Sequence, residues 1–176
     1  MQVFVGHRGP INCGEFTPDG RLQVLTKTLP SNIFPGKRII SADQAGFLIL
    51  WDPKSSTPIF KIGPDDARFD LDGITSLGVN PPSTLAVVGG AAGGVRVINL
   101  SKGDIIATLH GHTEGESIEA VAFADLSGSS SLGPGVAVTG ATDGKACIWD
   151  LSTMRLRASL KHEVEHLSDF VHFSDD

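Results

Sequence analysis

The residues with the most recognisable chemical spacing lie near the C-terminal end of the sequence. His162-Glu163-Val-Glu-His166 matches the pattern H-E-x-x-H, and His172 follows six residues later. On a helix, His162 and His166 would share one face and bind zinc, which would leave Glu163 as the general base of a peptidase. However, residues 167–173 are interpreted as a strand rather than as part of a helix. A zinc metallopeptidase is therefore kept as an alternative function and is not the preferred one.

A second candidate for chemistry is the glycine-rich run Gly89-Gly-Ala-Ala-Gly-Gly94. A phosphate-binding turn of this composition must lead into a helix whose N-terminus meets the phosphate. Here Val95-Arg-Val-Ile98 follows, and its branched residues predict a strand, so the run is expected to be a hairpin turn. No Ser/His/Asp or Cys/His arrangement can be interpreted, and Cys13 and Cys147 are expected to be buried strand residues. The sequence predicts a protein without catalytic residues, bound metal or cofactor.

Composition narrows the class of protein further. The chain has 176 residues, is 40% hydrophobic and 19% charged, and can therefore bury a core. Its 21 glycines and 10 prolines predict many turns and no long helices. The net charge of −6 argues against a nucleic-acid surface and fits a basic partner. With two cysteines, no apolar run of about 20 residues and no signal peptide at Met1 to Pro10, we expect a cytoplasmic protein, with the nucleus as a second location and no membrane contact.

The elements that must position any site come from an internal repeat. Three segments align: Ser41-Ala-Asp-Gln-Ala-Gly-Phe-Leu-Ile-Leu-Trp51-Asp52, Val88-Gly-Gly-Ala-Ala-Gly-Gly-Val-Arg-Val-Ile98-Asn99 and Thr139-Gly-Ala-Thr-Asp-Gly-Lys-Ala-Cys-Ile-Trp149-Asp150. Each unit begins in a similar way, with Gly6-His7, Gly63-Pro64 and Gly111-His112. Short β-type segments alternate with Pro- and Gly-containing turns inside each unit, which predicts four strands per unit. We also expect a strand at Gln2 to Val5 and another at about Leu167 to Phe173.

The combination of Gly-His with a later Trp-Asp resembles the WD-repeat (WD40) β-propeller family. This resemblance implies an all-β fold, a partial propeller of about three four-stranded antiparallel blades plus flanking strands. The blades would occupy residues 6–62, 63–110 and 111–161, and residues 162–176 would begin a further blade. Because a propeller typically closes with four to eight blades, we expect these units to be part of a larger propeller.

The resemblance also implies a hydrogen-bonded tetrad formed by His112, Thr139, Asp143 and Trp149. Such a closed chain would satisfy four buried polar side chains and tie a loop to a strand. In the other two units, Ala45 and Ala92 occupy the Asp position and Ile98 replaces the Trp. We therefore expect those units to rely on packing alone and to be less rigid.

Residues 21–36 interrupt the first unit between Pro18-Asp-Gly20 and Lys37-Arg-Ile-Ile40. Two explanations remain open. The segment could be a surface loop, which a propeller tolerates well. It could instead be a retained intron, because Leu25-Thr26 can encode a branch point and Phe34-Pro35-Gly36 can encode an acceptor site.

A narrower resemblance links the chain to the angio-associated migratory cell protein group. It rests on the stretches Asn12 to Gly20, Gly93 to Ile98, Glu116 to Phe123 and Trp149 to Arg157. In fungi this group includes a dedicated chaperone of a large-subunit ribosomal protein. The resemblance implies a role in ribosome biogenesis.

Acidic residues gather in the connections between units, which should emerge on one face of a propeller. They are Asp65, Asp66, Asp70, Asp72, Glu114, Glu116, Glu163 and Glu165, and only Arg68 offsets them. Carboxylates that converge from three loops would attract a Lys/Arg-rich segment, although polar loops can also be merely solvated. The preferred hypothesis is a non-catalytic scaffold or chaperone that captures a basic segment of a ribosomal protein. A general WD adaptor in signalling or trafficking is the other alternative.

Overall fold

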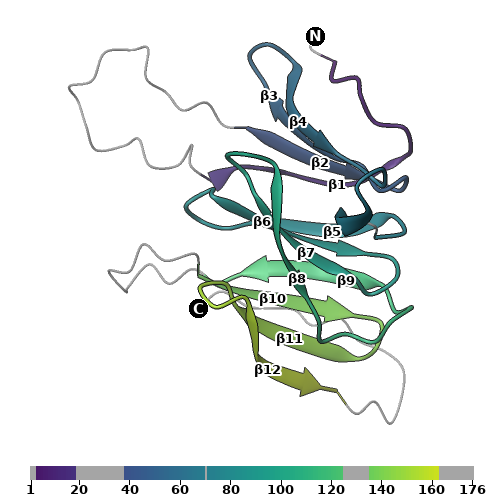
Figure 1. Cartoon of the computed structure of the whole chain (residues 1–176), viewed down its shortest axis with the longest axis vertical. Helices are drawn as coiled ribbons and strands as arrows, with labels where there is room; N and C mark the ends of the chain where they lie inside the picture. Colours follow the sequence, from purple (N-terminus) through teal and green to yellow (C-terminus); the bar gives the residue numbers. More distant parts are fainter. Residues whose placement is uncertain (1–2, 19–37, 70, 125–134, 163–176) are drawn as a thin grey trace, which may run out of the picture.

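The computed structural model describes residues 3–18, 38–69, 71–124 and 135–162, which form three four-stranded antiparallel sheets (Figure 1). The first sheet contains β1 (Ile11–Phe16), β2 (Ile39–Asp43), β3 (Leu48–Asp52) and β4 (Thr57–Ile62). The second contains β5 (Ile74–Val79), β6 (Leu85–Gly90), β7 (Val95–Asn99) and β8 (Asp104–Leu109). The third contains β9 (Ile118–Phe123), β10 (Val136–Ala141), β11 (Lys145–Asp150) and β12 (Arg155–Lys161). The predicted all-β architecture of four-stranded sheets is confirmed.

The sheets stack face to face, and the second sheet contributes to two separate cores. Successive side chains of a strand point to opposite faces of its sheet. Every residue of β6 is buried, so both faces of the second sheet are covered. Val88 joins Leu50 and Ile98 in the core between the first and second sheets. The neighbouring Val87 joins Trp149 in the core between the second and third sheets. Burial of apolar area on both faces of the middle sheet is therefore the main force that holds the three sheets together.

The first strands of the three sheets, β1, β5 and β9, lie next to one another and are joined by side-chain hydrogen bonds. From β1, Asn12 Nδ2 donates to a β5 carbonyl at 2.8 Å, and Glu15 Oε2 accepts from a β5 backbone N–H at 3.0 Å. From β5, the hydroxyls of Thr75 and Ser76 donate to the Ile118 carbonyl at 2.6 and 2.8 Å. These bonds fix the register between neighbouring sheets, which apolar packing alone specifies weakly.

The last strand of each sheet carries one extra residue at an equivalent place. The ladder shifts between Leu50/Trp51, Val97/Ile98 and Ile148/Trp149, and the unpaired outer residues are Ile59, Ile106 and Arg157. Such a bulge twists an edge strand and hinders further pairing with another strand. All three bulge residues are exposed.

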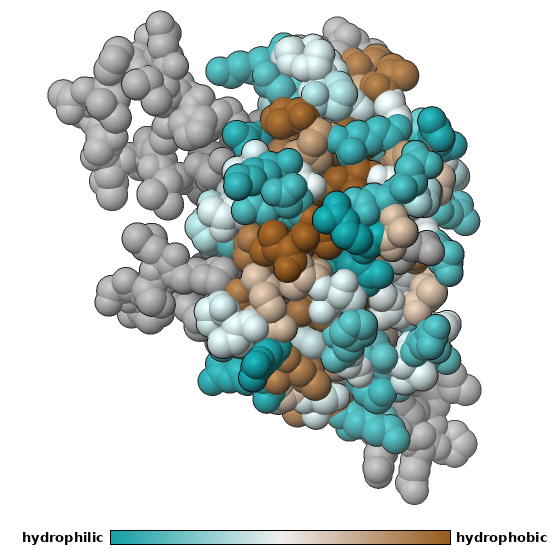
Figure 2. Space-filling model, viewed as in Figure 1, coloured by the Kyte–Doolittle hydropathy of each residue, from teal (hydrophilic) through white to brown (hydrophobic). Residues whose placement is uncertain are grey.

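In the view of Figure 2, apolar residues form small separate groups among hydrophilic ones.

Some expectations are corrected and others fall outside the described residues. The strand expected at Gln2 to Val5 is wrong over residues 3–5, which are irregular because no described strand lies beside them to hydrogen-bond. This segment instead packs on the first sheet, where the Phe4 ring lies 5.4 Å from the Trp51 ring. The glycine-rich run is the β6–β7 hairpin, as predicted. The segment 21–36 and the strand expected at 167–173 lie outside the described residues. In the part of the chain that is described, no helix is long and apolar enough to span a membrane.

A Glu15→Gln variant tests how pH acts on the β1–β5 contact. Burial raises the pKa of Glu15, although the hydrogen bond from the Val79 N–H opposes the rise. Because the folded state then binds the proton more tightly than the unfolded state, stability should decline as pH rises above the ordinary glutamate pKa of about 4.3. Glutamine keeps an acceptor oxygen and removes the charge. Its Tm, measured by circular dichroism from about pH 4 to about pH 7, should decline less than the wild-type Tm. Parallel curves would contradict this expectation.

Candidate functional site

The connections between the sheets lie at the same edge of the molecule as the turns between the second and third strands of each sheet (Figure 1). We call it the connection rim: residues 63–73 and 110–117, which link the sheets, and the turns at 44–47, 91–94 and 142–144. In every sheet, the N–H of the first turn residue donates to the carbonyl of the residue that precedes the first strand. These bonds are Gln44 to Pro10, Ala91 to Gly73 and Thr142 to Ser117, at 2.9, 3.0 and 2.9 Å. The same backbone hydrogen bond therefore fixes the equivalent turn of each sheet on the rim.

In the third sheet, the structure brings the four predicted tetrad side chains together. Trp149 Nε1 donates to Thr139 Oγ1 at 2.7 Å, and His112 Nε2 lies 2.7 Å from the same hydroxyl. His112 Nδ1 lies 3.2 Å from Asp143 Oδ1. A carboxylate can only accept, so Nδ1 carries the imidazole proton and Nε2 accepts from the Thr139 hydroxyl. Hydrogen bonds thus link the buried Trp149, in β11, to His112, in the connection that precedes the sheet.

The first sheet contains an equivalent network, and the prediction that this unit relies on packing alone is wrong. His7 Nδ1 lies 2.8 Å from Asp43 Oδ2, and His7 Nε2 lies 2.6 Å from Ser41 Oγ. Trp51 Nε1 donates to Ser41 Oγ at 2.7 Å. The acid comes from the end of β2 and not from the turn position of Ala45. A hydroxyl ten residues before the Trp, as in the third sheet, was the sequence signal for this network.

The Asp43 carboxylate also organises the backbone around it. It accepts the N–H groups of Phe47 at 2.8 Å, Arg8 at 3.0 Å and Gly9 at 3.4 Å. Burial alone would raise the pKa of Asp43, but the hydrogen bonds from Phe47, His7, Arg8 and Gly9 outweigh it and lower the pKa. One buried anion therefore fixes both the chain before β1 and the β2–β3 turn.

Among the described residues, the second sheet has no polar network at this place. Val88 and Ile98 occupy the positions of the tetrad hydroxyl and Trp, and both are fully buried. Phe69, in the 3₁₀ turn Ala67–Phe69, and Leu71 pack against them from the connection. Apolar packing therefore takes the place of hydrogen bonding in this sheet, and its lower rigidity stays a prediction.

The predicted acidic residues that are described all lie on the connections of the rim. Asp66 forms a two-point ion pair with Arg68, whose hydrogen bonds lower the pKa of Asp66, and Glu116 accepts from the Thr142 hydroxyl at 2.7 Å. Of the predicted acids that are described, three have no hydrogen-bond or ion-pair partner in the described part of the chain: Asp65, Asp72 and Glu114. The other predicted acids, Asp70, Glu163 and Glu165, lie outside the described residues.

The expectation that only Arg68 offsets these acids is wrong. Lys145, at the start of β11, donates to Thr113 Oγ1 at 3.0 Å and lies 3.3 Å from the Asp143 carboxylate. Arg8 and Lys61 also reach the rim, beside Asp65 and Asp66. These cations belong to segments outside the connections, so the sequence of the connections did not reveal them. The rim carries mixed charge and is not uniformly negative.

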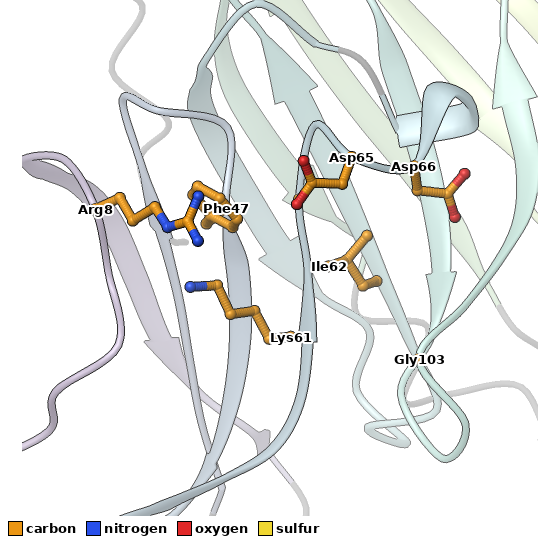
Figure 3. A pocket seen from close by; sticks show the side chains of 8 residues that line it. Arg8, Phe47, Lys61, Ile62, Asp65, Asp66 and Gly103 are labelled. Atoms are coloured by element: carbon orange, nitrogen blue, oxygen red, sulfur yellow. The ribbon is translucent and has the colours of Figure 1, made fainter.

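A cavity of about 580 Å³ lies on the rim at the junction of the first and second sheets (Figure 3). Its lining residues are Arg8, Phe47, Lys61, Ile62, Gly63, Asp65, Asp66 and Gly103. The Lys61 ammonium and the Arg8 guanidinium lie 4.1 and 5.1 Å from the centroid of the Phe47 ring. The Asp65 carboxylate points toward this group, whereas the Asp66 carboxylate points away (Figure 3). Sequence analysis missed the cavity because its walls come from segments far apart in the chain.

The possible zinc residues are only partly described. His162 follows β12, and its N–H donates to the Gly144 carbonyl at 2.9 Å, which continues the hairpin at that point. Glu163, His166 and His172 lie outside the described residues. Among the residues that are described, no group of three or more His, Cys, Asp or Glu side chains could hold a metal ion.

Comparisons with known proteins agree with this geometry. The sequence profile described as "WD40: WD domain, G-beta repeat" matches residues 1–52 and 103–150. An uncharacterized WD repeat-containing protein of Schizosaccharomyces pombe is 31% identical over 169 residues, which are 93% of this chain and 37% of that protein. The human angio-associated migratory cell protein is 25% identical over 178 residues, 97% of this chain and 36% of that protein. The crystal structure of the RRP9 WD40 repeats superposes with a TM-score of 0.72 at 16% identity, over 92% of this chain and 41% of that one. The chain thus spans little more than a third of the length of these curated relatives.

The network around Asp43 can be tested with Asp43→Asn. The variant removes the charge that several backbone N–H groups share, and it should lower the free energy of unfolding by about 2–4 kcal/mol in urea titrations. Asp52→Asn is the matched control, because the Asp52 carboxylate accepts only the Lys54 N–H at a surface turn. Its effect should stay within about 0.5 kcal/mol. Equal losses in the two variants would show that Asp43 has no special role.

A further prediction concerns acid unfolding and Asp143. Burial would raise the pKa of Asp143, but hydrogen bonds from the Thr113 and Lys145 N–H groups and from the His112 and Lys145 side chains hold it well below its usual range. The stabilisation is therefore present above the unfolded-state pKa of about 3.9 and is lost as pH falls toward the folded-state pKa. Asp143→Asn should be less stable at neutral pH and lose less stability on acidification. The free energy of unfolding can be measured by urea titration at several pH values, with Glu119→Gln as the control. If the stability of Asp143→Asn depended on pH as steeply as that of the wild type and the control, this prediction would be refuted.

Proposed function

This chain belongs to the WD40 repeat family, and from that premise we propose that it is a non-catalytic scaffold that binds a basic segment of a partner protein on the connection rim. The observation that carries the proposal is the set of exposed, unpaired carboxylates of Asp65, Asp72 and Glu114 on that edge. A lysine or arginine of a partner can pair with each of them without breaking a bond inside the protein. Such charges chiefly steer and select a partner, while packing supplies the remaining affinity.

The geometry of the rim supports a recognition role because the carboxylates are attached to fixed loops. The connection before the third sheet is held by His112 and Asp143, and the connection before the second is anchored by buried Phe69 and Leu71. Loops fixed in this way lose little conformational entropy when a partner binds. Rigid sheets that present loop side chains are a common basis of protein recognition.

The partner that we propose is a ribosomal protein with a Lys/Arg-rich segment, which would make the protein a chaperone in ribosome biogenesis. This finer proposal is supported by the resemblance to the angio-associated migratory cell protein group, whose human member aligns with nearly the whole chain. We accordingly propose a cytoplasmic location, with the nucleus as a second location. A general adaptor in signalling or trafficking would use the same rim for a partner of different charge.

The decisive experiment removes the three unpaired carboxylates in the full-length protein with Asp65→Asn, Asp72→Asn and Glu114→Gln together. Binding of a lysine-rich peptide, measured by fluorescence anisotropy at low ionic strength, should weaken by about tenfold or more. The dependence of affinity on salt should also become shallower, because fewer ion pairs form.

The matched control removes three carboxylates outside the rim, with Asp52→Asn, Glu119→Gln and Asp150→Asn. It changes the net charge by the same amount, and asparagine keeps the acceptor oxygens that cap the turns at Asp52 and Asp150. Equal affinity in the two triple variants would reject the rim as the binding site. Capture from a lysate tests the finer proposal: the wild type and the control should retain a ribosomal protein that the rim variant loses, and retention by all three would exclude the proposed mode of capture.

A further inference from the structure

The cavity at the junction of the first two sheets is lined by two cations, Arg8 and Lys61. Arg8 and Lys61 both lie against the Phe47 ring, and neither forms an ion pair with a carboxylate in the described part of the chain. Asp66, which also lines the cavity, is paired with Arg68 and points away (Figure 3). The aromatic ring holds the two cations without neutralising them. Their N–H groups are therefore available to an anion that enters the cavity.

The buried network of the first sheet fixes the backbone of Arg8 and Phe47, and a separate hydrogen bond holds Lys61. The Asp43 carboxylate accepts the N–H groups of both Arg8 and Phe47, at 3.0 and 2.8 Å. Lys61 Nζ donates one hydrogen bond to the Gly6 carbonyl at 2.6 Å, which leaves two of its three N–H bonds for a ligand. Gly63 lets the ring lie against the backbone, because a Cβ there would meet a Phe47 ring carbon at 2.3 Å. An anion would therefore meet a site that is already organised.

The opposite wall of the cavity carries the unpaired carboxylate of Asp65, which points inward (Figure 3). An isolated phosphate, with a charge of about −1.5 to −2, would be drawn to the cations but repelled by this group. Two neighbouring side chains of opposite charge satisfy both walls at once. The volume of about 580 Å³ is in the range of pockets that accept a small ligand or a pair of side chains.

We propose that this cavity binds an acidic side chain of the partner together with an adjacent basic one. The carboxylate pairs with Arg8 and Lys61, and the cation pairs with Asp65. The inference rests on the proposed function, because it specifies the kind of segment that the rim selects. The partner segment is then not merely basic but contains a Glu-Lys or Asp-Arg type pair, which distinguishes it from a plain polylysine tail.

The experiment compares three labelled peptides of equal length, titrated into the full-length protein and followed by fluorescence anisotropy. One contains only lysines as charged residues, one contains Glu-Lys pairs, and one contains phosphoserine-Lys pairs. The wild type should bind the Glu-Lys peptide about tenfold more tightly than the lysine peptide. Arg8→Gln with Lys61→Gln should abolish this preference while binding of the lysine peptide is unchanged or stronger.

The control pair, Lys54→Gln with Arg155→Gln, removes one lysine and one arginine away from the cavity and should keep the preference. Arg8 and Lys61 are exposed, so both double variants should keep the wild-type Tm. A Glu-Lys preference that survives Arg8→Gln with Lys61→Gln would overturn the inference. Tighter binding of the phosphoserine peptide that depends on these two residues would also overturn it in favour of a phosphate site. If the triple rim variant bound the lysine peptide as well as the wild type did, the proposed function would fail. A Glu-Lys preference that depends on Arg8 and Lys61 would still support the cavity as a site in that case.

Discussion

The architecture of the rim depends on buried carboxylates that accept hydrogen bonds from the segment before a sheet and from a turn inside it. Asp43 does this in the first sheet and Asp143 in the third, each beside an imidazole. A hydrogen bond to a charged group contributes about 1.5–3 kcal/mol, and leaving such a group buried without partners costs more. The carboxylates are tolerated inside the protein because both oxygens of each accept hydrogen bonds. This requirement fixes the segment before β1, which carries Arg8, and the connection before the third sheet, which carries Glu114.

The second sheet shows that a polar network is one of two workable solutions. Apolar side chains from β6 and β7 pack there with Phe69 of the 3₁₀ turn and Leu71 in one buried cluster. Replacing a buried polar network by apolar side chains of similar volume is often close to neutral in free energy, so repeats can differ here without losing the fold. What the apolar version lacks is a charged group that orders a neighbouring loop, as Asp43 does by accepting the backbone N–H of Arg8.

Recognition at this rim follows from charges that the protein does not neutralise itself. Asp66 and Glu116 are already bonded, which leaves Asp65, Asp72 and Glu114 as acceptors for a partner. The cations on Phe47 add a contribution of opposite sign in the cavity that Asp65 also lines. A surface with both signs in fixed positions selects for a pattern of charge rather than for net charge. Exposed charges farther apart than about 8–10 Å are screened at physiological salt, so only neighbouring charges can act together on a bound segment.

The sequence by itself determined the repeat and the four strands of each sheet, because these follow from local alternation and turn residues. The tetrad around Thr139 was implied by the resemblance to the WD-repeat family, and the structure brings its members together. It did not determine which acid serves the first sheet: Ala45 stands at the aligned position, and Asp43 reaches the same imidazole from the strand end. It also did not reveal the cations on Phe47, which come from segments distant in the chain. Through-space distance decided these features, since a carboxylate or an ammonium acts on whatever the stacking of the sheets brings within a few ångströms.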